Sequence, residues 1–465
     1  MMRFLALVAL LVPLVGNAQV LLPEEVVARV LEHHPIALAA GLRIDVAEAE
    51  QMKARGGFDP KLAGDFRAKE FEDKLYYSVG DAGLKIPTPI GMDVDLGYQN
   101  TGGIFLNTEQ TMPIDGLLGA GVSLELGQGL IIDARRAALR QAEFALTLGE
   151  SEQRLMINQL VSEALMAYWS WFEAWHREDI LRGSVTLAQT RRDGVVQSAI
   201  QGDKPFQDTL EAGIQVLNRR QLQMEAAQDL MLKRALLEAY LWDTGNAPLQ
   251  LNPAVLPPAI DAVDGGIPEL PAPQGSWLAD HPTLLQGQAL ISQKDVDLRW
   301  KREQLKPEFG LKCQWLASPQ TLGGEDPITV RDAAVGVDLA FPLFLRKERA
   351  SIRLTEIDLA TKRYELSDKQ RSLELKSTAH RSGWALMDDR REVQRQAVQN
   401  AGSLLQGERQ LFQVGESSLF LVNAREQYYI NTQLKQVEIL RKMAENRVKI
   451  LELEAALAPL PQQAP

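Results

Sequence analysis

The sequence repeats itself, and this duplication limits the chain to folds built from two similar halves. The segment "EHHPIALAAGLRIDVAEAEQMKARGGFDPKL" (32–62) aligns without a gap with "ADHPTLLQGQALISQKDVDLRWKREQLKPEF" (279–309), at an offset of 247 residues. Further on, "RAALRQAE" (136–143) aligns with "RASIRLTE" (349–356), and the offset is then 213 residues. An internal repeat indicates one structural unit used twice. Because the offset falls by 34 residues between the two matches, the first copy carries a longer insertion.

The second offset then holds without slippage along a stretch that has helical periodicity in both copies. Loops tolerate insertions, whereas helices of matched length do not. We expect long helices over 138–201 and 349–414, each spanning roughly 100 Å at 1.5 Å per residue, and a shorter return helix after each. Helices of this length are typical of a coiled coil or a helical barrel, not of a globular core.

Each long helix meets a glycine at the same place in its copy. These glycines are Gly202, in "AIQGDKPFQ", and Gly415, in "FQVGESSLF". A glycine just past a helix end adopts the left-handed conformation without strain. Asp203 after the first glycine, and Ser417 and Ser418 after the second, are residues that cap the start of a new helix. The pattern predicts helix–turn–helix tips at both glycines, and a mere kink explains the paired occurrence less well.

Between the helices of each copy the periodicity changes to two residues, which predicts β-strands. "FGLKCQWL" and "AVGVDLAF" in the second copy, and "GMDVDLGYQ" and "GAGVSLELGQ" in the first, each place apolar residues on one face. In the first copy, Leu62 and Phe66 begin this alternation earlier in the chain. We expect hairpins within 60–128 and 307–342, about four strands in all, with extra loop or strand material in the first copy. If the apolar face meets lipid, so few strands cannot close a barrel, and several chains must share one. A soluble sheet is the alternative.

Segments of different composition separate the two copies and flank them. At the N-terminus, Arg3 precedes an apolar run that ends in small residues before a cleavage site after Ala18. This arrangement is typical of a secretory signal peptide. The expected organisation is a signal peptide (1–18), a first repeat (19–242), a proline-rich linker (243–276), a second repeat (277–458) and a C-terminal tail (459–465).

Composition argues against several classes of function. The formal charge is −11 and basic residues form no long run, so nucleic-acid binding is not expected. A single cysteine, Cys313, permits no intrachain disulfide, and the five histidines lack metal-ligand spacing. His34 and His281 are interpreted as helix-end residues. Nucleophile and phosphate-binding motifs are absent from the sequence, and we expect neither an enzyme nor a bound cofactor or metal.

The complete layout resembles the TolC-like outer-membrane efflux proteins. "FQVGESSLFLVNARE" (412–426) and "AIQGDKPFQDTLEA" (199–212) at the tips, the two His-Pro helix openings and the junction "GVDLAFPLFLRKERA" (336–350) carry the resemblance. The resemblance implies a mostly α fold with a β-barrel part. Long α-helical hairpins would form a trimeric α-barrel, and about four strands per chain would form a shared transmembrane β-barrel of twelve strands.

The same resemblance implies a place and partners. The protein would lie in the outer membrane of a Gram-negative bacterium, with a large periplasmic part, as the passive exit duct of a tripartite efflux or type I secretion system. A homotrimer would contact outer-membrane lipid and would dock to a periplasmic adaptor (membrane fusion) protein and to an inner-membrane pump of the RND or ABC type. The docking tips would be Gln201, Gly202, Asp203, Val414, Gly415 and Glu416.

Some members of the family hold an acidic residue six positions after the second glycine, at the closed pore entrance. Here that position is Leu421, and the equivalent position in the first copy is Asp208, with Glu211 about one helical turn further on. A ring of Asp208 side chains would favour cations. Acids solvated on a helix face are the alternative reading. For the whole chain, a periplasmic coiled-coil structural protein of the cell envelope is the alternative, although it leaves the paired hairpins and matched tips unexplained.

Overall fold

The computed structural model describes residues 20–265, 270, 277–319 and 332–458. The expected signal peptide and C-terminal tail lie outside these residues. The described residues separate into two compact units, and each unit takes segments from both repeats. The units are described one at a time. The "tip unit" comprises the described parts of 20–40, 154–277 and 373–458, and the "sheet unit" comprises those of 41–153 and 278–372.

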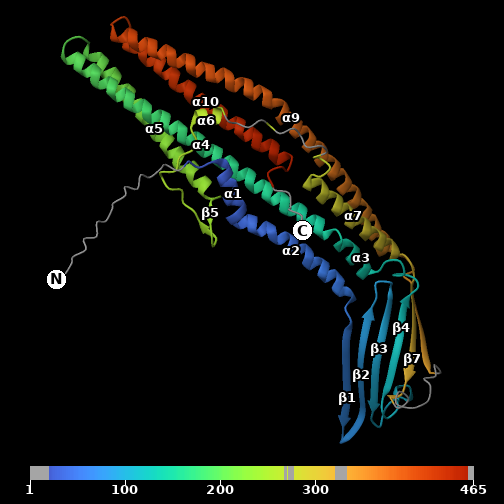
Figure 1. The fold of residues 1–465 in the computed structure, drawn as a ribbon. Helices are drawn as coiled ribbons and strands as arrows, with labels where there is room; N and C mark the ends of the chain where they lie inside the picture. Colours follow the sequence, from blue (N-terminus) through green and yellow to red (C-terminus); the bar gives the residue numbers. More distant parts are fainter. Residues whose placement is uncertain (1–19, 266–269, 271–276, 320–331, 459–465) are drawn as a thin grey trace, which may run out of the picture. The chain divides into compact units, whose positions relative to one another are not determined.

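The sheet unit contains one antiparallel sheet of six strands in the order β1-β2-β3-β4-β7-β8 (Figure 1). Four strands come from the first repeat and two from the second, so the prediction of about four strands per chain is wrong. The unpredicted strand is β2, whose alternation is obscured by glycines and by apolar residues on both faces. The strands are β1 (Lys61–Phe71), β2 (Lys74–Pro87), β3 (Met92–Gly102), β4 (Leu117–Glu125), β7 (Glu308–Ala317) and β8 (Ala333–Ala340).

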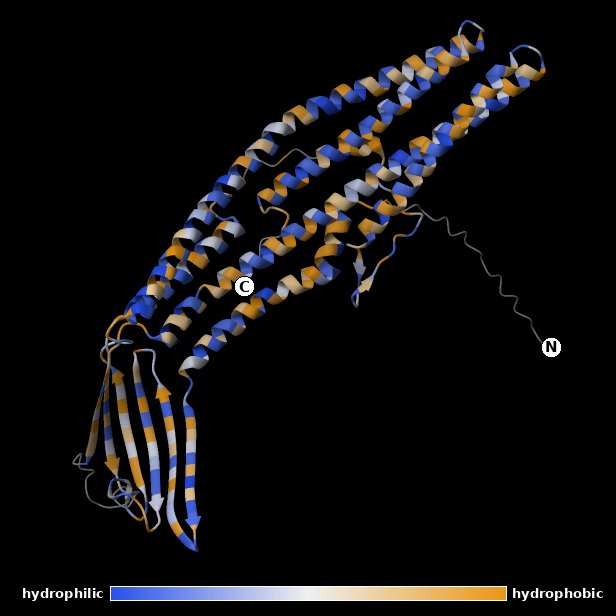
Figure 2. Ribbon diagram, turned by 180° about the vertical axis from the view of Figure 1, so that it is seen from behind, coloured by the Kyte–Doolittle hydropathy of each residue, from blue (hydrophilic) through white to orange (hydrophobic). Residues whose placement is uncertain are grey.

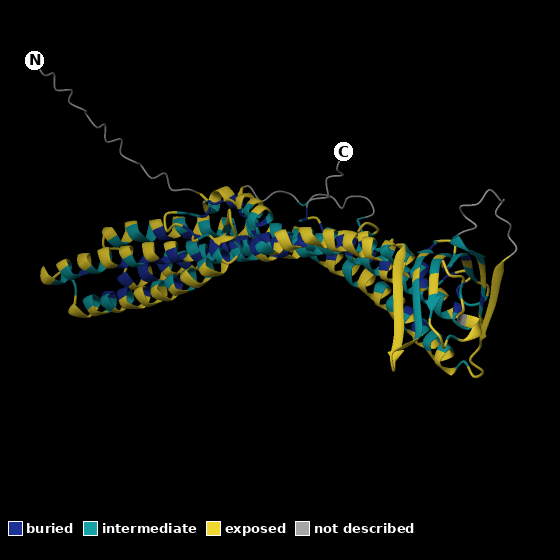
Figure 3. Cartoon of the chain, turned by 90° about the horizontal axis from the view of Figure 1, so that it is seen from below, coloured by how far each residue is buried: buried dark blue, intermediate teal, exposed yellow. Residues whose placement is uncertain are grey.

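The strand register gives this sheet one apolar and one polar face. Leu62, Leu84 and Leu96 lie opposite one another on three successive strands. The adjacent row contains Lys61 and Lys85, whose side chains point to the other face because successive residues of a strand alternate. Figure 2 shows this alternation along the strands. Most strand residues are exposed or half-buried (Figure 3), and Leu62 is 81% exposed.

Helices in the sheet unit show one departure from the expected pattern. A continuous helix was expected from residue 138, but two residues, Glu143 and Phe144, separate the end of α3 (Ala134–Ala142) from the start of α4 (Ala145–Ile200). The break places Phe144 against an apolar cluster that contains Ile132 and Val296. The interruption of the helical pattern thus coincides with an aromatic side chain that packs against the cluster. In the described part of the chain, no helix has the length and apolarity needed to cross a membrane.

Two helical hairpins form most of the tip unit, α4 with α5 and α9 with α10 (Figure 1). Tyr168, Trp171 and Phe172 on α4 are almost fully buried, and the Tyr168 hydroxyl donates a hydrogen bond to the Leu21 carbonyl (2.9 Å). The remaining elements are α1 (Pro23–His33), α2 (Pro35–Arg55), η1 (Gly56–Phe58), η2 (Thr108–Gln110), α5 (Phe206–Glu238), β5 (Trp242–Asp243), β6 (Ala247–Pro248), α6 (Ile260–Asp264), α7 (Pro282–Glu303), α9 (Arg346–Gln413) and α10 (Leu419–Leu453).

A histidine caps the helix that opens at each His-Pro sequence. The Nδ1 atom of His34 accepts a hydrogen bond from the backbone N–H of Ile36 (3.2 Å), and Nδ1 of His281 accepts one from Thr283 (3.2 Å). Burial lowers the pKa of His34, although a backbone hydrogen bond to Ala239 opposes the shift. Both histidines therefore act at helix ends, as the sequence indicated.

Candidate functional site: the helical tips

The first tip reverses the chain at a left-handed glycine. Gly202 has φ +83°, and its N–H donates to the carbonyl of Ala199 (3.1 Å). The N–H of Asp203 donates to the carbonyl of Ser198 (3.0 Å). These two bonds form the Schellman motif, which satisfies the last carbonyls of α4. No atom would lie within 4 Å of a Cβ at Gly202, so only the backbone conformation requires glycine there.

The second tip uses the same motif. Gly415 has φ +81°, its N–H donates to Phe412 (3.2 Å), and the N–H of Glu416 donates to Leu411 (2.9 Å). The helix–turn–helix geometry predicted for both glycines is thus present, with matching hydrogen bonds. Two segments that lie 213 residues apart in the sequence therefore have the same turn conformation.

The tips differ in how the returning helix begins. At the second tip, Ser418 Oγ accepts from the N–H of Leu421 (3.3 Å), which confirms Ser418 as a cap of α10. At the first tip, α5 follows Pro205 and has no side-chain cap, so the predicted cap at Asp203 is wrong. Asp203 lies within the preceding turn, and Pro205, with φ −68°, already has the value that a helix requires.

The six tip residues expected at the docking surface are all exposed and belong to one unit. Figure 3 shows that the ends of the hairpins are exposed. The side chain of Val414 is 70% exposed, and so is that of Phe206, which begins α5. Apolar side chains exposed on a turn are available for contact with another protein. The residues concerned are Gln201, Gly202, Asp203, Val414, Gly415 and Glu416.

The residues expected at the pore gate lie in the first two turns of the returning helices. Asp208 and Glu211 are half-buried on α5, and neither carboxylate forms an ion pair with another described residue. Leu421 is 40% exposed in the first turn of α10. The structure therefore brings the two acids together on one helix and leaves an apolar residue at the corresponding place on the other hairpin.

Apolar packing joins the two tips to each other. Val195, Ala212 and Leu419 form a buried cluster, against which Phe412 packs. The Lys204 ammonium lies 4.0 Å from the centre of the Phe412 ring. A cation at this distance from an aromatic face contributes about 0.5–1 kcal/mol when exposed. The first-repeat tip is thus attached to the second.

A buried carboxylate joins all four helices behind the tips. Glu426, on α10, is 1% exposed and accepts two hydrogen bonds from Arg191 (2.7 and 2.8 Å) and one from Arg409 (2.9 Å). It also forms an ion pair with Arg219. The three arginines come from α4, α9 and α5, respectively. This "Glu426 cluster" (Glu426, Arg191, Arg219 and Arg409) contains one negative and three positive side chains.

Opposing effects set the charge of the cluster. Burial raises the pKa of Glu426, but hydrogen bonds from Arg191 and the charge of Arg219 outweigh it, so the pKa is below the usual value. Arg219 is only 2% exposed, and burial lowers its pKa against the attraction of Glu426. Removing one partner from such a set leaves buried charges without compensation, which typically costs about 3–5 kcal/mol. The cluster therefore holds the hairpins in one arrangement.

The Glu426 cluster was not predicted from the sequence, although one signal for it exists. Leu419, Val422, Glu426 and Ile430 fall on one buried stripe of α10. A charged residue on such a stripe indicates a buried ion pair. Its partners could not be assigned, because the first-repeat position that matches Glu426 is Gly213. Among the described residues, no group of three or more His, Cys, Asp or Glu is placed to hold a metal ion.

Comparison with known proteins identifies relatives of this fold. Residues 275–455 match the family model described as outer membrane efflux protein. A search of the curated proteins finds no match. Three similar solved structures are the outer membrane channel CmeC of Campylobacter jejuni (12% identity, TM-score 0.69, 95% of this chain and 87% of that one), VceC of Vibrio cholerae (13%, 0.65, 93% and 96%) and the open state of MtrE of Neisseria gonorrhoeae (15%, 0.67, 94% and 89%). The predicted combination of helical hairpins with a barrel-forming sheet is the fold of these channels.

Proposed function

We propose that the chain belongs to the outer membrane efflux protein family, whose model matches residues 275–455, and that it is a passive exit duct in the outer membrane of a Gram-negative bacterium. The observation that carries the proposal is a sheet with one continuous apolar face, attached to long helical hairpins. The apolar face suits lipid and the polar face suits a water-filled lumen. A duct of this kind contributes no chemistry, and its partner supplies the energy.

The sheet supports the assembly of several chains. Both of its edge strands, β1 and β8, have one side that no described strand pairs. An unpaired sheet edge is not tolerated in lipid, because its backbone N–H and C=O groups have no partner there. Several copies must then close the sheet together, and we take the number three from the family resemblance. The helical hairpins of three copies would line the periplasmic part of the duct.

We assign docking to the tips. The duct would meet a periplasmic adaptor protein there and, through the adaptor or directly, an inner-membrane pump of the RND or ABC type. Two features support this role: the six tip residues are exposed, and Val414 and Phe206 present apolar side chains at the ends of the hairpins. Tripartite efflux and type I secretion both use such a contact, so the cargo depends on the pump.

We assign gating to the residues just behind the tips. Three copies would place three Asp208 and three Glu211 carboxylates around the narrow end, and Leu421 would form an apolar ring beside them. Carboxylate rings favour cations. In planar bilayers, Asp208→Asn should raise conductance or reduce cation preference, whereas Asp203→Asn, an exposed acid of the turn, should change neither. Equal effects of the two substitutions would remove Asp208 from the gate.

Membrane extraction tests the function itself. The protein should stay in the membrane fraction in high salt and in urea, and should leave it in detergent as a trimer that conducts ions in a bilayer. Release by urea as a rod without conductance would favour the alternative, a periplasmic coiled-coil structural protein. A photo-crosslinker at position 414 should capture an adaptor that mass spectrometry identifies. The same group at Leu386, which is 71% exposed on α9 away from the turn, is the control.

A further inference from the structure

The first repeat carries a hairpin that the second repeat lacks. Its extra residues lie between the two offsets of the internal duplication, and the structure places β2 and β3 there. Both strands are paired along their length: β1 with β2, β2 with β3, and β3 with β4. The second repeat joins through the pairing of β4 with β7. The inserted hairpin is therefore part of the sheet.

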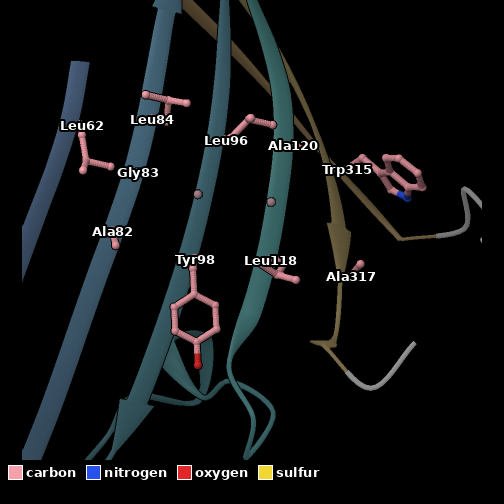
Figure 4. A pocket seen from close by; sticks show the side chains of 12 residues that line it. Leu62, Ala82, Gly83, Leu84, Leu96, Tyr98, Leu118, Ala120, Trp315 and Ala317 are labelled. Carbon is pink, nitrogen blue, oxygen red and sulfur yellow. The ribbon is translucent and has the colours of Figure 1, made fainter. Parts of the chain in front are cut away.

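The inserted strands continue the apolar face of their neighbours. Leu84 on β2 and Leu96 on β3 lie between Leu62 on β1 and Ala120 on β4, and Trp315 on β7 is next in the row. Figure 4 shows these side chains along a shallow hollow of about 450 Å³ on the strands. The hollow exists because the residues that line it on β2, β3 and β4 include several glycines and alanines, whose side chains are small. A hairpin that formed a plug or a loop would have no reason to repeat the lipid-facing pattern in register.

The two edges of the sheet are suited to pair with each other between copies of the chain. With six strands, each antiparallel to the next, β1 and β8 run in opposite directions. Leu62 and Phe66 on β1 are 81% and 72% exposed, and Val335 and Leu339 on β8 are 68% and 70% exposed. All four lie on the apolar face. Antiparallel pairing of β8 in one copy with β1 in the next would continue that face without interruption.

One alignment of the two edges pairs β8 along its full length with β1 and sets how such a sheet would close. A row of opposed residues that starts at Lys61 on β1 reaches Ala334 on β8, six residues before Ala340 at the end of that strand. If Ala340 of one copy lies opposite Lys61 of the next, the sheet advances six residues for every six strands. The shear number then equals the number of strands. The (β/α)₈ barrel, with eight strands and a shear number of eight, has the same ratio and a strand tilt of about 36°. The row is Lys61, Lys85, Asp95, Gly121, Gln314 and Ala334.

This register also joins side chains that suit each other. Leu62 would lie opposite Leu339 and Phe66 opposite Val335, both on the lipid face. On the polar face, the Lys61 ammonium would lie diagonally from Asp338, within reach of a long side chain. Asp338 already pairs with Lys312 on its other side (2.8 Å). Charge and apolar contacts therefore favour the same alignment.

We propose that the occupant of each open edge is a second copy of this chain and that three copies close a barrel of eighteen strands, six from each. The inference rests on the proposed function, because it takes the trimer from there. It departs from the twelve strands that the resemblance implies. Barrel diameter grows roughly linearly with strand number, so the barrel would be about 1.5-fold wider than one of twelve strands at equal tilt. The duct would pass wider cargo at its outer end.

Cysteine pairs test the junction. In a Cys313→Ser background, Ala68→Cys and Ala333→Cys would lie directly opposite each other across β1 and β8 of neighbouring copies. Oxidation should give covalent dimers and trimers on a non-reducing gel, and no larger species. The matched control combines Ala68→Cys with Ala334→Cys, whose side chain points to the other face. We expect at least about tenfold less cross-linking in the control, since disulfide geometry is narrow.

Electron cryomicroscopy of the detergent-solubilised full chain decides the strand number. Eighteen strands around one lumen, with β8 beside β1 of the next copy, would establish the inference. A membrane-embedded trimer with twelve strands, and β2 and β3 outside the wall, would overturn it and leave the proposed function intact. A particle that is not a membrane-embedded trimer would overturn both.

Discussion

The two repeats share their helices and turns, but they differ in the strands between the helices and in the way each returning helix begins. Both glycine turns form the same pair of hydrogen bonds. The first repeat, however, supplies four strands of the six-stranded sheet and the second repeat two. Pro205 precedes the returning helix in the first, whereas Ser418 caps it in the second. Both repeats keep a helical hairpin that turns at the equivalent glycine. The side chains that begin the returning helix and the number of strands differ between them.

A second divergence lies inside the tip unit. The first repeat contributes Arg191 and Arg219 to the Glu426 cluster, and the second contributes Arg409 and the only carboxylate. A symmetric duplication would have produced two such sites. With one carboxylate shared by arginines of both repeats, the two hairpins depend on each other, and substitutions can separate common features from those that belong to one repeat.

The largest effect should come from the shared cluster. Glu426→Ala should lower the free energy of unfolding by about 3–5 kcal/mol, because Arg191 and Arg219 remain buried without a counter-charge. Thermal unfolding of the purified protein, followed by circular dichroism, measures this. The control is Glu392→Ala, which removes an ion pair with Arg395 on the surface of α9 and should leave the midpoint nearly unchanged. Equal midpoints for the two variants would show that the hairpins do not depend on the cluster.

The pH dependence of the same cluster should appear only in acid. The pKa of Glu426 is lower in the folded chain than its ordinary value of 4.5. A carboxyl with a lowered pKa stabilises the fold fully above its unfolded pKa, and this stabilisation is lost as the pH falls through the folded pKa. The stability difference between the wild type and Glu426→Ala should therefore be constant from about pH 8 to 5.5 and shrink below about pH 4.5. A difference that shrinks already near neutral pH would contradict the assignment.

The turns should respond alike in both repeats. Gly202→Ala and Gly415→Ala should each destabilise by about 1–2 kcal/mol, because a Cβ disfavours the left-handed conformation. Gly213→Ala and Gly407→Ala are matched controls within α5 and α9, where nothing lies within 4 Å of the added Cβ. Both should stabilise slightly, since alanine favours a helix. Unequal effects at Gly202 and Gly415 would break the equivalence of the two tips.

Substitution of the residue expected to cap the returning helix should have a different effect in each repeat. Ser418→Ala should cost about 1 kcal/mol, because the N–H of Leu421 loses its acceptor. Asp203→Ala should have little effect, since α5 begins after Pro205 without a side-chain cap. Denaturant unfolding of the two variants provides the measurement. A cost at Asp203 equal to that at Ser418 would mean that Asp203 caps α5 after all.

Periodicity and duplication predicted the features that repeat locally. The expected helix 349–414 matches α9 (Arg346–Gln413), and both glycine turns lie where their position in the two copies indicated. These features depend on nearby residues, whose spacing the sequence displays directly. The resemblance to the TolC-like proteins rested on the same layout.

Features that depend on distant partners escaped prediction. At the break before α4, Phe144 packs against a cluster that includes Val296, which is far away in the sequence. Strand β2 became evident only through its pairing with β1 and β3, since its own alternation is weak. The Glu426 cluster needs four helices at once. No local pattern could state which arginines would meet the carboxylate.

The smallest effect concerns the histidines that open a helix in each repeat. Protonated Nδ1 donates instead of accepting, so His34 loses its cap to Ile36 when it is charged. Burial lowers the pKa of His34 below its ordinary value of 6.5. The cap is then fully present above about pH 6.5 and is lost as the pH falls through the lowered folded pKa. Between about pH 7.5 and 5.5, above the range of Glu426, the loss should stay below about 1 kcal/mol, the net worth of one hydrogen bond.

Asparagine separates this cap from other effects of pH, because its side chain caps helices and does not titrate. His34→Asn should flatten the unfolding free energy over the same pH range relative to the wild type. His281 makes the same bond to Thr283 and is 3% exposed, so His281→Asn is the matched variant in the other repeat. If His34→Asn leaves the slope unchanged, the cap does not depend on the charge of His34. If only one of the two variants flattens it, the helix openings have diverged in chemistry while keeping the same geometry, as the tips have.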